Sequence, residues 1–135
     1  MRAVSAFIIM LAASLAATFA HAHGPTRQKA FESITIKASP EAVWDKVGDF
    51  TKLHGWHPAV ESSTATNRSE VGSVRTLNLK GGGQVIETLE SIDPAAKKFS
   101  YRAKDGGALP VTNYSSNMTV KAGEGGTTVV EWRGA

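Results

Sequence analysis

The sequence predicts an α+β domain built on a curved antiparallel sheet. An alternating segment is followed by a short amphipathic helix, and six further strand-like segments continue to the end of the chain. Turns rich in glycine, aspartate and asparagine separate those six segments, and connections this short favour antiparallel neighbours. An order of one strand, one or two helices and then six strands is typical of α+β domains.

The first strand and the helix are predicted from side-chain periodicity and capping. Residues 31–37 (FESITIK) alternate apolar and polar side chains, as a half-buried strand does. A helix should begin after Ser39, whose hydroxyl can cap it, because Pro40 suits the first helical position. Gly48 falls within the helical pattern and is expected to cost about 1 kcal/mol relative to alanine. Spacings of three and four residues place these apolar side chains on one face: Val43, Trp44, Val47 and Phe50.

The rest of the chain is predicted as a short helical turn and six strands. The turn is expected within residues 51–58 (TKLHGWHP), where Gly55 and Pro58 end it. Strands are expected near residues 60–66, 73–80, 84–92, 98–104, 111–121 and 127–133.

Composition excludes several classes of function. The chain has no cysteine, which excludes disulfides, iron–sulfur clusters, thiolate metal sites and cysteine nucleophiles. Its net charge is +3 and its basic residues are scattered, so no nucleic-acid footprint is expected. The sequence contains no G-x-S-x-G elbow, phosphate loop or dinucleotide fingerprint. We therefore expect no cofactor.

Residues 1–22 have the features of a secretory signal peptide. Their apolar centre, residues 6–17, is shorter than the roughly 20 residues that a membrane span needs. Ala20-His21-Ala22 has the small-x-small form of a signal-peptidase site. We expect cleavage after this motif, a periplasmic protein and no membrane attachment of the mature chain. A polar leader, residues 23–30, would then precede the domain at residues 31–135.

Six short motifs are spread over nearly all of residues 31–135. They are ASPEAVW (38–44), GDF (48–50), WHPAV (56–60), VGSVRTL (71–77), ETLE (87–90) and Asp93. Together they resemble the polyketide cyclase/START-like superfamily, also called SRPBCC or Bet v 1-like. That resemblance implies a helix-grip fold, in which a seven-stranded sheet wraps around a long C-terminal helix. It also implies a cavity between them for a small apolar or amphipathic ligand.

Three further segments indicate a subgroup. They are HGPT (23–26), GWHP (55–58) and ALPV (108–111). They are similar to the periplasmic methanol-oxidation accessory proteins of the MxaD type. This resemblance implies a partner, namely a periplasmic quinoprotein methanol dehydrogenase or its cytochrome acceptor.

The segment HGWHP at residues 54–58 holds the first candidate site residues. Trp56 and His57 could line the mouth of the cavity, since such sites are mostly apolar with a few polar groups. Alternatively, Trp56 plugs the sheet entrance and His57 satisfies a backbone carbonyl. A metal site would need more ligands than His54 and His57 supply, so none is expected. His23 could offer its amine and imidazole to copper at the mature N-terminus, although a solvated terminus is favoured.

Arg75 and Glu87 are the second candidate pair. If the three glycines at 81–83 form the hairpin loop, Leu77 pairs with Glu87, and Arg75 is diagonal to Glu87 on the apolar face. An exposed ion pair would contribute about 0–1 kcal/mol. A buried pair would instead orient the carbonyl or hydroxyl of a ligand. Tyr101 and Tyr114 could pack in the core or present polar tips to a ligand.

These residues support two functions. The favoured one is a non-catalytic periplasmic binding or accessory protein. The alternative is a cyclase/dehydratase-type enzyme, in which His57 or the pair Arg75 and Glu87 transfers a proton at a carbonyl substrate.

The chain is also expected to lack part of the domain. No segment after Trp132 can form the long C-terminal helix that the resemblance implies. Only about a fifth of the residues from 23 onward are Leu, Ile, Val or Phe, which is low for a closed core. The apolar side chains that the missing helix would cover are therefore expected to be open to water: Leu77, Leu79, Val85 and Leu89.

Overall fold

The computed structural model describes residues 29–108 and 112–135, and in them it shows a seven-stranded antiparallel sheet with one α-helix. The predicted signal peptide lies outside the described residues. The strands are β1 (Ala30–Ile36), β2 (Val60–Ala65), β3 (Val74–Leu79), β4 (Gln84–Asp93), β5 (Lys98–Asp105), β6 (Thr112–Ala122) and β7 (Thr128–Gly134). The helix is α2 (Pro40–Val47), and two short 3₁₀ turns are η1 (Leu53–Gly55) and η2 (Glu124–Gly126). The predicted α+β class is confirmed.

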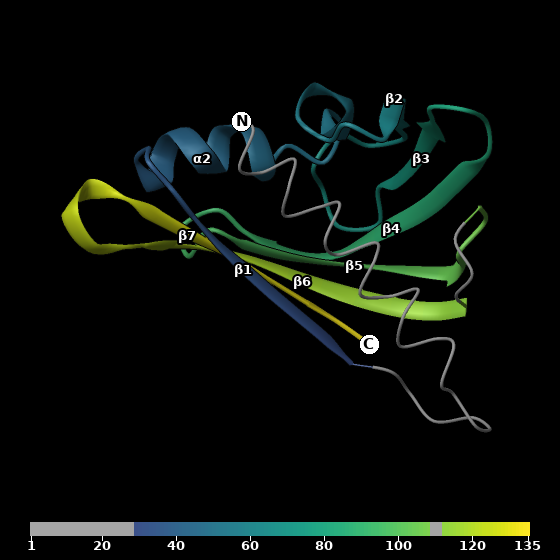
Figure 1. Cartoon of the computed structure of the whole chain (residues 1–135). Helices are drawn as coiled ribbons and strands as arrows, with labels where there is room; N and C mark the ends of the chain where they lie inside the picture. The colour runs from purple at the N-terminus through teal and green to yellow at the C-terminus, as the bar shows by residue number, and fades with distance from the viewer. Residues whose placement is uncertain (1–28, 109–111) are drawn as a thin grey trace.

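The sheet is a meander with one long-range closure. Its order is β1-β7-β6-β5-β4-β3-β2, so every strand pairs with its neighbour in sequence except β1, which pairs with β7. Figure 1 shows α2 above the sheet, with β2 and β3 curling toward the same side. The curved sheet and α2 therefore enclose one face, on which the candidate site residues lie.

Helix α2 forms for the predicted reasons. The Ser39 hydroxyl accepts a hydrogen bond from the Ala42 amide at 3.2 Å, and Pro40 occupies the first turn. Val43 and Val47 are buried, while the Trp44 ring meets Phe99 edge-on at 6.1 Å between centroids. Among the described residues, no helix is long and apolar enough to cross a membrane.

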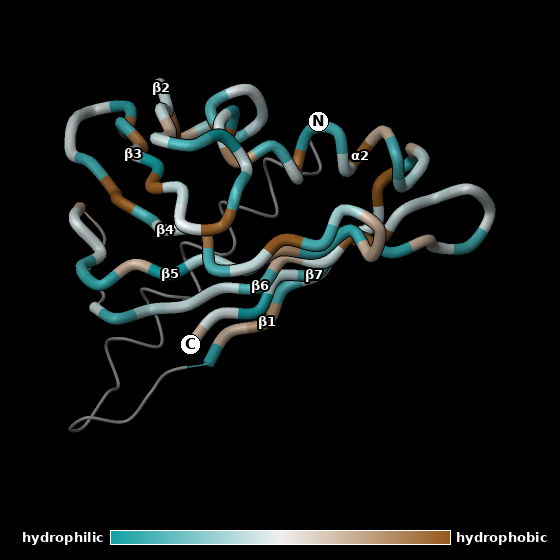
Figure 2. Tube along the Cα trace, turned by 180° about the vertical axis from the view of Figure 1, so that it is seen from behind, coloured by the Kyte–Doolittle hydropathy of each residue, from teal (hydrophilic) through white to brown (hydrophobic). Residues whose placement is uncertain are grey.

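Two hydrophobic clusters line the enclosed face. The larger joins α2 to the centre of the sheet, and its buried members are Val43, Val47, Phe50, Leu89, Phe99, Tyr101, Met118, Val120, Val130 and Trp132. The smaller contains Leu53, Val60, Leu77 and Val85. Figure 2 shows how hydrophobic and hydrophilic residues alternate along β3 and β4, which directs one set inward.

The expectation that this face is open to water is wrong for the described structure. Leu77, Val85 and Leu89 are only 4%, 2% and 0% exposed. Leu53 of η1 packs with Leu77 and Val85, and Phe50 belongs to the same cluster as Leu89. The segment after α2 thus covers apolar surface that was expected to be bare.

The register of the β3–β4 hairpin differs from the prediction by two residues. Pairing ends at Asn78 with Gln84, and Arg75 lies directly opposite Glu87 rather than diagonal to it. The Leu79 amide donates to the Gly83 carbonyl at 3.0 Å, so the loop begins earlier than expected. The Lys80 amide donates to the Ala59 carbonyl at 2.9 Å instead of pairing with Gln84. A shift of two residues keeps every side chain on its predicted face.

Gly48 gives the first testable prediction. It is the C-cap of α2 with an ordinary φ of −78°, and an added Cβ would lie 2.5 Å from the Trp44 ring. Helix propensity alone predicts that Gly48→Ala stabilises the protein, whereas the packing predicts destabilisation by about 1–3 kcal/mol.

Chemical denaturation would measure this effect. Gly55→Ala is the matched control, because an added Cβ there meets nothing within 4 Å, and it should stay within about 0.5 kcal/mol of the wild type. A Gly48→Ala protein that is more stable than the wild type would show that the Trp44 ring moves aside freely.

Candidate functional site

The centre of the candidate site is an ion pair between two adjacent strands. Arg75 on β3 contacts one carboxylate oxygen of Glu87 on β4 through Nη2 at 2.7 Å and Nε at 2.8 Å. Their side chains are only 4% and 6% exposed, so the alternative of a solvent-exposed pair is wrong. A buried pair of this kind is held in place because either charge alone would be strongly disfavoured there.

Two aromatic rings enclose the guanidinium. The Arg75 Cζ lies 4.1 Å from the centroid of Phe50 and 4.9 Å from that of Tyr101. Both distances are within the range of a cation–π interaction. Phe50 was predicted only as part of the helical face, so its role at this site was missed. Nothing in the sequence indicated that a residue beyond the helix would reach across to β3.

Tyr114 on β6 occupies the other side of the carboxylate. Its hydroxyl donates to the second oxygen of Glu87, the one that Arg75 does not contact. Burial, followed by the negative charge of Glu87, raises the pKa of Tyr114 above its ordinary value. Both oxygens of Glu87 therefore have a donor within the protein.

Tyr101 on β5 is fixed by a third aromatic residue. The Trp132 indole nitrogen on β7 donates to the Tyr101 hydroxyl at 3.1 Å. Burial, and then the charge of Glu87, raises the pKa of Tyr101, so it stays a neutral phenol. The structure thus brings together Arg75, Glu87, Tyr101 and Tyr114 from four consecutive strands.

Trp56 lies where the two hydrophobic clusters meet. It packs against both of them, and its ring centroid is 6.2 Å from that of His57. Its indole nitrogen is buried and has no hydrogen-bond partner among residues 29–108 and 112–135. A buried donor without a partner is rare in folded proteins and calls for an explanation.

His57 is held as a neutral imidazole. Burial, and then the charge of Arg75, lowers its pKa from 6.5 to about 4. Its Nδ1 accepts a hydrogen bond from the Ala59 amide at 3.1 Å, so the proton of the neutral ring resides on Nε2. The backbone group at Nδ1 is thus a donor, and the alternative that His57 satisfies a backbone carbonyl stays a prediction that concerns the hydrogen on Nε2.

His54 does not join His57 in a common site. It is exposed, and its Nδ1 lies 2.7 Å from the Ser63 hydroxyl, which itself donates to the Thr51 carbonyl at 2.8 Å. Within the part of the chain that the structure describes, no group of three or more His, Asp or Glu side chains could hold a metal ion.

The acceptor atoms of the two candidate bases are engaged within the protein. Arg75 and Tyr114 occupy both oxygens of Glu87, so this carboxylate has no oxygen free of a protein donor with which to act as a base. The basic nitrogen of His57 is likewise occupied by the Ala59 amide. In this arrangement the two groups named as alternative catalytic bases act as structural acceptors.

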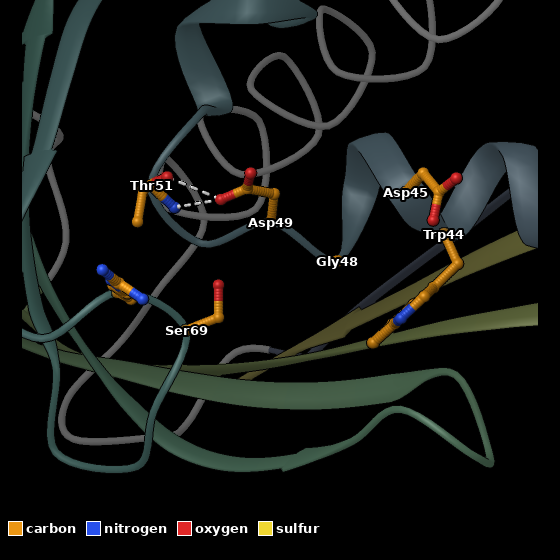
Figure 3. A pocket seen from close by; sticks show the side chains of 7 residues that line it. Trp44, Asp45, Gly48, Asp49, Thr51 and Ser69 are labelled. Atoms are coloured by element: carbon orange, nitrogen blue, oxygen red, sulfur yellow. Dashed lines mark hydrogen bonds between the residues drawn. The ribbon is translucent and has the colours of Figure 1, made fainter.

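A separate surface pocket of about 510 Å³ lies beyond the end of α2. Figure 3 shows Asp49 accepting hydrogen bonds from the backbone and hydroxyl of Thr51, with Ser69 across the opening. The pocket is also lined by Trp44, Asp45, Gly48 and Arg68. These residues differ from the predicted ligand-binding residues.

The family of the chain follows from comparison with known proteins. A family described as polyketide cyclase/dehydrase and lipid transport matches residues 27–135. The chain belongs to this family. Two of its relatives of known structure are each 35% identical to it. One is an uncharacterised protein from Bacillus thuringiensis, with a TM-score of 0.71 over 80% of this chain and 77% of that one. Another is the protein XoxI from Bacillus cereus, with a TM-score of 0.72 over 81% and 75%.

A more distant structure shares the fold of this polyketide cyclase/dehydrase family member. Norcoclaurine synthase from Thalictrum flavum is 17% identical, with a TM-score of 0.62 over 79% of this chain and 67% of that one. At this identity the likeness concerns the fold alone. The predicted superfamily is therefore confirmed, and the MxaD-type subgroup stays a prediction.

A double-mutant cycle on Arg75 and Glu87 tests the buried pair. Arg75→Met and Glu87→Gln should each destabilise the protein by up to about 3–5 kcal/mol. The reason is that each variant leaves the charge of the other residue buried without its partner. The double variant should lose less than the sum of the two.

Arg102 and Glu90 are the matched control pair. Their closest contact is 3.7 Å and their side chains are 63% and 39% exposed, so the coupling energy there should be about 0–1 kcal/mol. Equal coupling energies in the two cycles, from urea unfolding, would contradict the assignment of Arg75 and Glu87 as the pair that depends on burial.

The lowered pKa of His57 predicts a pH dependence of stability. The unfolded chain takes up a proton near pH 6.5 and the folded chain only near pH 4, so the unfolded state binds more protons between these values. The free energy of unfolding should therefore fall as the pH is lowered from about 6.5 to 4, by at most about 1.4 kcal/mol per unit for one proton.

Urea unfolding at several pH values would measure this slope. His57→Asn should flatten it over the same interval, whereas His54→Asn, at an exposed position, should retain the contribution of His57. Identical slopes for the wild type and His57→Asn would overturn the assignment.

Proposed function

We propose that this protein binds a small, largely apolar molecule on the concave face of its sheet, and that it does so without catalysis. The observation that carries the proposal is the polar cluster around Arg75 and Glu87. It is buried in an otherwise apolar wall, which is the usual composition of small-molecule sites. Membership of a family described by both dehydrase and lipid-transport activity is consistent with such a site.

The finer proposal concerns where the protein acts. We propose that residues 1–22 direct export and that the mature protein works in the periplasm, on the basis of the signal-peptide features of the sequence. The MxaD-type motifs support a role beside a methanol dehydrogenase or its cytochrome. In that role the protein would either bind a small molecule for the dehydrogenase system or contact one of its proteins through its outer surface.

Binding explains the cluster better than cyclase or dehydratase chemistry does. A general base needs a free lone pair directed at the substrate. Glu87 and Nδ1 of His57 both face donors within the protein. Three protein contacts leave Glu87 about one of its roughly four acceptor sites for proton transfer, whereas ligand binding requires no free base.

The three tryptophans provide the test. Trp56 lies at the proposed site, Trp44 lines the surface pocket, and Trp132 supports Tyr101 from β7. Titration with 2-acetylnaphthalene should shift the indole N–H resonance of Trp56 more than the other two in ¹H–¹⁵N NMR spectra. A shift confined to Trp44 would place binding in the surface pocket, and no shift at any of the three would contradict ligand binding.

The same protein, recovered from the periplasm of its source, tests the finer proposal. Native mass spectrometry should show a chain that begins at His23 and a co-purifying molecule. A full-length chain found in the membrane fraction would contradict export with cleavage.

A further inference from the structure

The polar atoms of the site that have no hydrogen-bond partner among the described residues indicate which polar group a ligand carries. Glu87 has a protein donor on each oxygen, and the Tyr101 oxygen accepts from Trp132. Each of these oxygens therefore has a protein donor. Two buried polar atoms have no partner within residues 29–108 and 112–135: the Ser116 hydroxyl, which can donate or accept, and the Trp56 indole N–H, which can only donate.

His57 adds a second donor beside Trp56. Since Nδ1 of His57 accepts from the Ala59 amide, Nε2 carries the hydrogen and can only donate. The two rings are 6.2 Å apart between centroids and tilted by 36°. The two rings are thus neighbours, each with an N–H group, and the indole lies at the junction of the two hydrophobic clusters.

The charge of the site distinguishes between neutral and anionic acceptors. The positive charge of Arg75 is matched by Glu87 at 2.7 Å, and its guanidinium is covered by Phe50 and Tyr101. No net positive charge remains in this cluster to compensate a buried carboxylate or phosphate. Burial of an unpaired anion is strongly unfavourable, whereas a carbonyl oxygen needs only a donor.

We infer that the ligand carries a neutral oxygen acceptor, a ketone, aldehyde or ester carbonyl, which receives a hydrogen bond from Trp56 Nε1 with His57 Nε2 as the neighbouring donor. This inference rests on the proposed binding function and specifies its ligand class. Trp56 is accordingly the residue that determines specificity, and a protonated amine of the same shape is rejected because its ammonium group has only donors to present to these N–H groups.

Three probes of similar size separate the contribution of the carbonyl hydrogen bond to binding from that of apolar packing. They are 2-acetylnaphthalene, 2-ethylnaphthalene and 1-(2-naphthyl)ethylamine. The wild type should bind the ketone about five- to tenfold more tightly than the hydrocarbon, the range expected for one hydrogen bond. The amine should bind more weakly than both. Trp56→Phe should abolish the preference for the ketone and keep most of the affinity for 2-ethylnaphthalene, because the aromatic packing remains.

Trp44→Phe is the matched control, since it removes the same N–H group from the surface pocket, and it should leave the preference unchanged. If Trp56→Phe does not fold, the carbonyl stretch of ¹³C-labelled ketone bound to the wild type provides the second measurement. Its frequency should be lower than in an alkane solvent.

The outcomes distinguish this inference from the proposed function. Failure of all three naphthalenes to bind contradicts the binding function itself. Binding with equal affinity for ketone and hydrocarbon, an equal loss of both in Trp56→Phe, or an unshifted carbonyl stretch overturns the inference and leaves the binding function standing.

Discussion

The buried pair of Arg75 and Glu87 is the constraint on which the rest of the structure depends. Neither charge is tolerable alone at an exposure of about 5%, so each surrounding element supplies a partner. The hairpin register places the two residues opposite each other, and Phe50 and Tyr101 cover the guanidinium. Tyr114 completes the carboxylate from β6. Five separate segments of the chain are thereby tied to one point.

This arrangement also explains why the polar groups of the site differ in their availability. Groups close to the pair are engaged within the protein: both oxygens of Glu87 have protein donors, and Tyr101 is oriented by Trp132. Trp56 belongs to the segment between α2 and β2, which packs on the sheet without joining its ladder. Its indole N–H consequently has no partner among residues 29–108 and 112–135.

Sequence periodicity predicted the fold and the face of the sheet on which Arg75 and Glu87 lie. Alternation fixes the face of each strand residue, so Arg75 and Glu87 were assigned to the apolar face even though their register was wrong by two residues. The part that could not be predicted depends on contacts between distant segments. The Lys80 amide pairs with Ala59, and Phe50 reaches Arg75, through the path of the chain after α2. That path has no periodic signal, so the cover over Leu77 and Val85 was also missed.

The pairing of β1 with β7 has a consequence for how the protein folds. Ala30 lies opposite Gly134, so this ladder closes a loop of about a hundred residues and forms only after β7 exists. The meander from β2 to β6 is local in sequence and can assemble earlier, which favours a sequential route with a slow final step. Until that step β7 has an unsatisfied edge, and an edge of this kind can recruit a strand from another chain. Because Trp132 of β7 anchors Tyr101, the candidate site also becomes fully ordered only when folding is nearly complete.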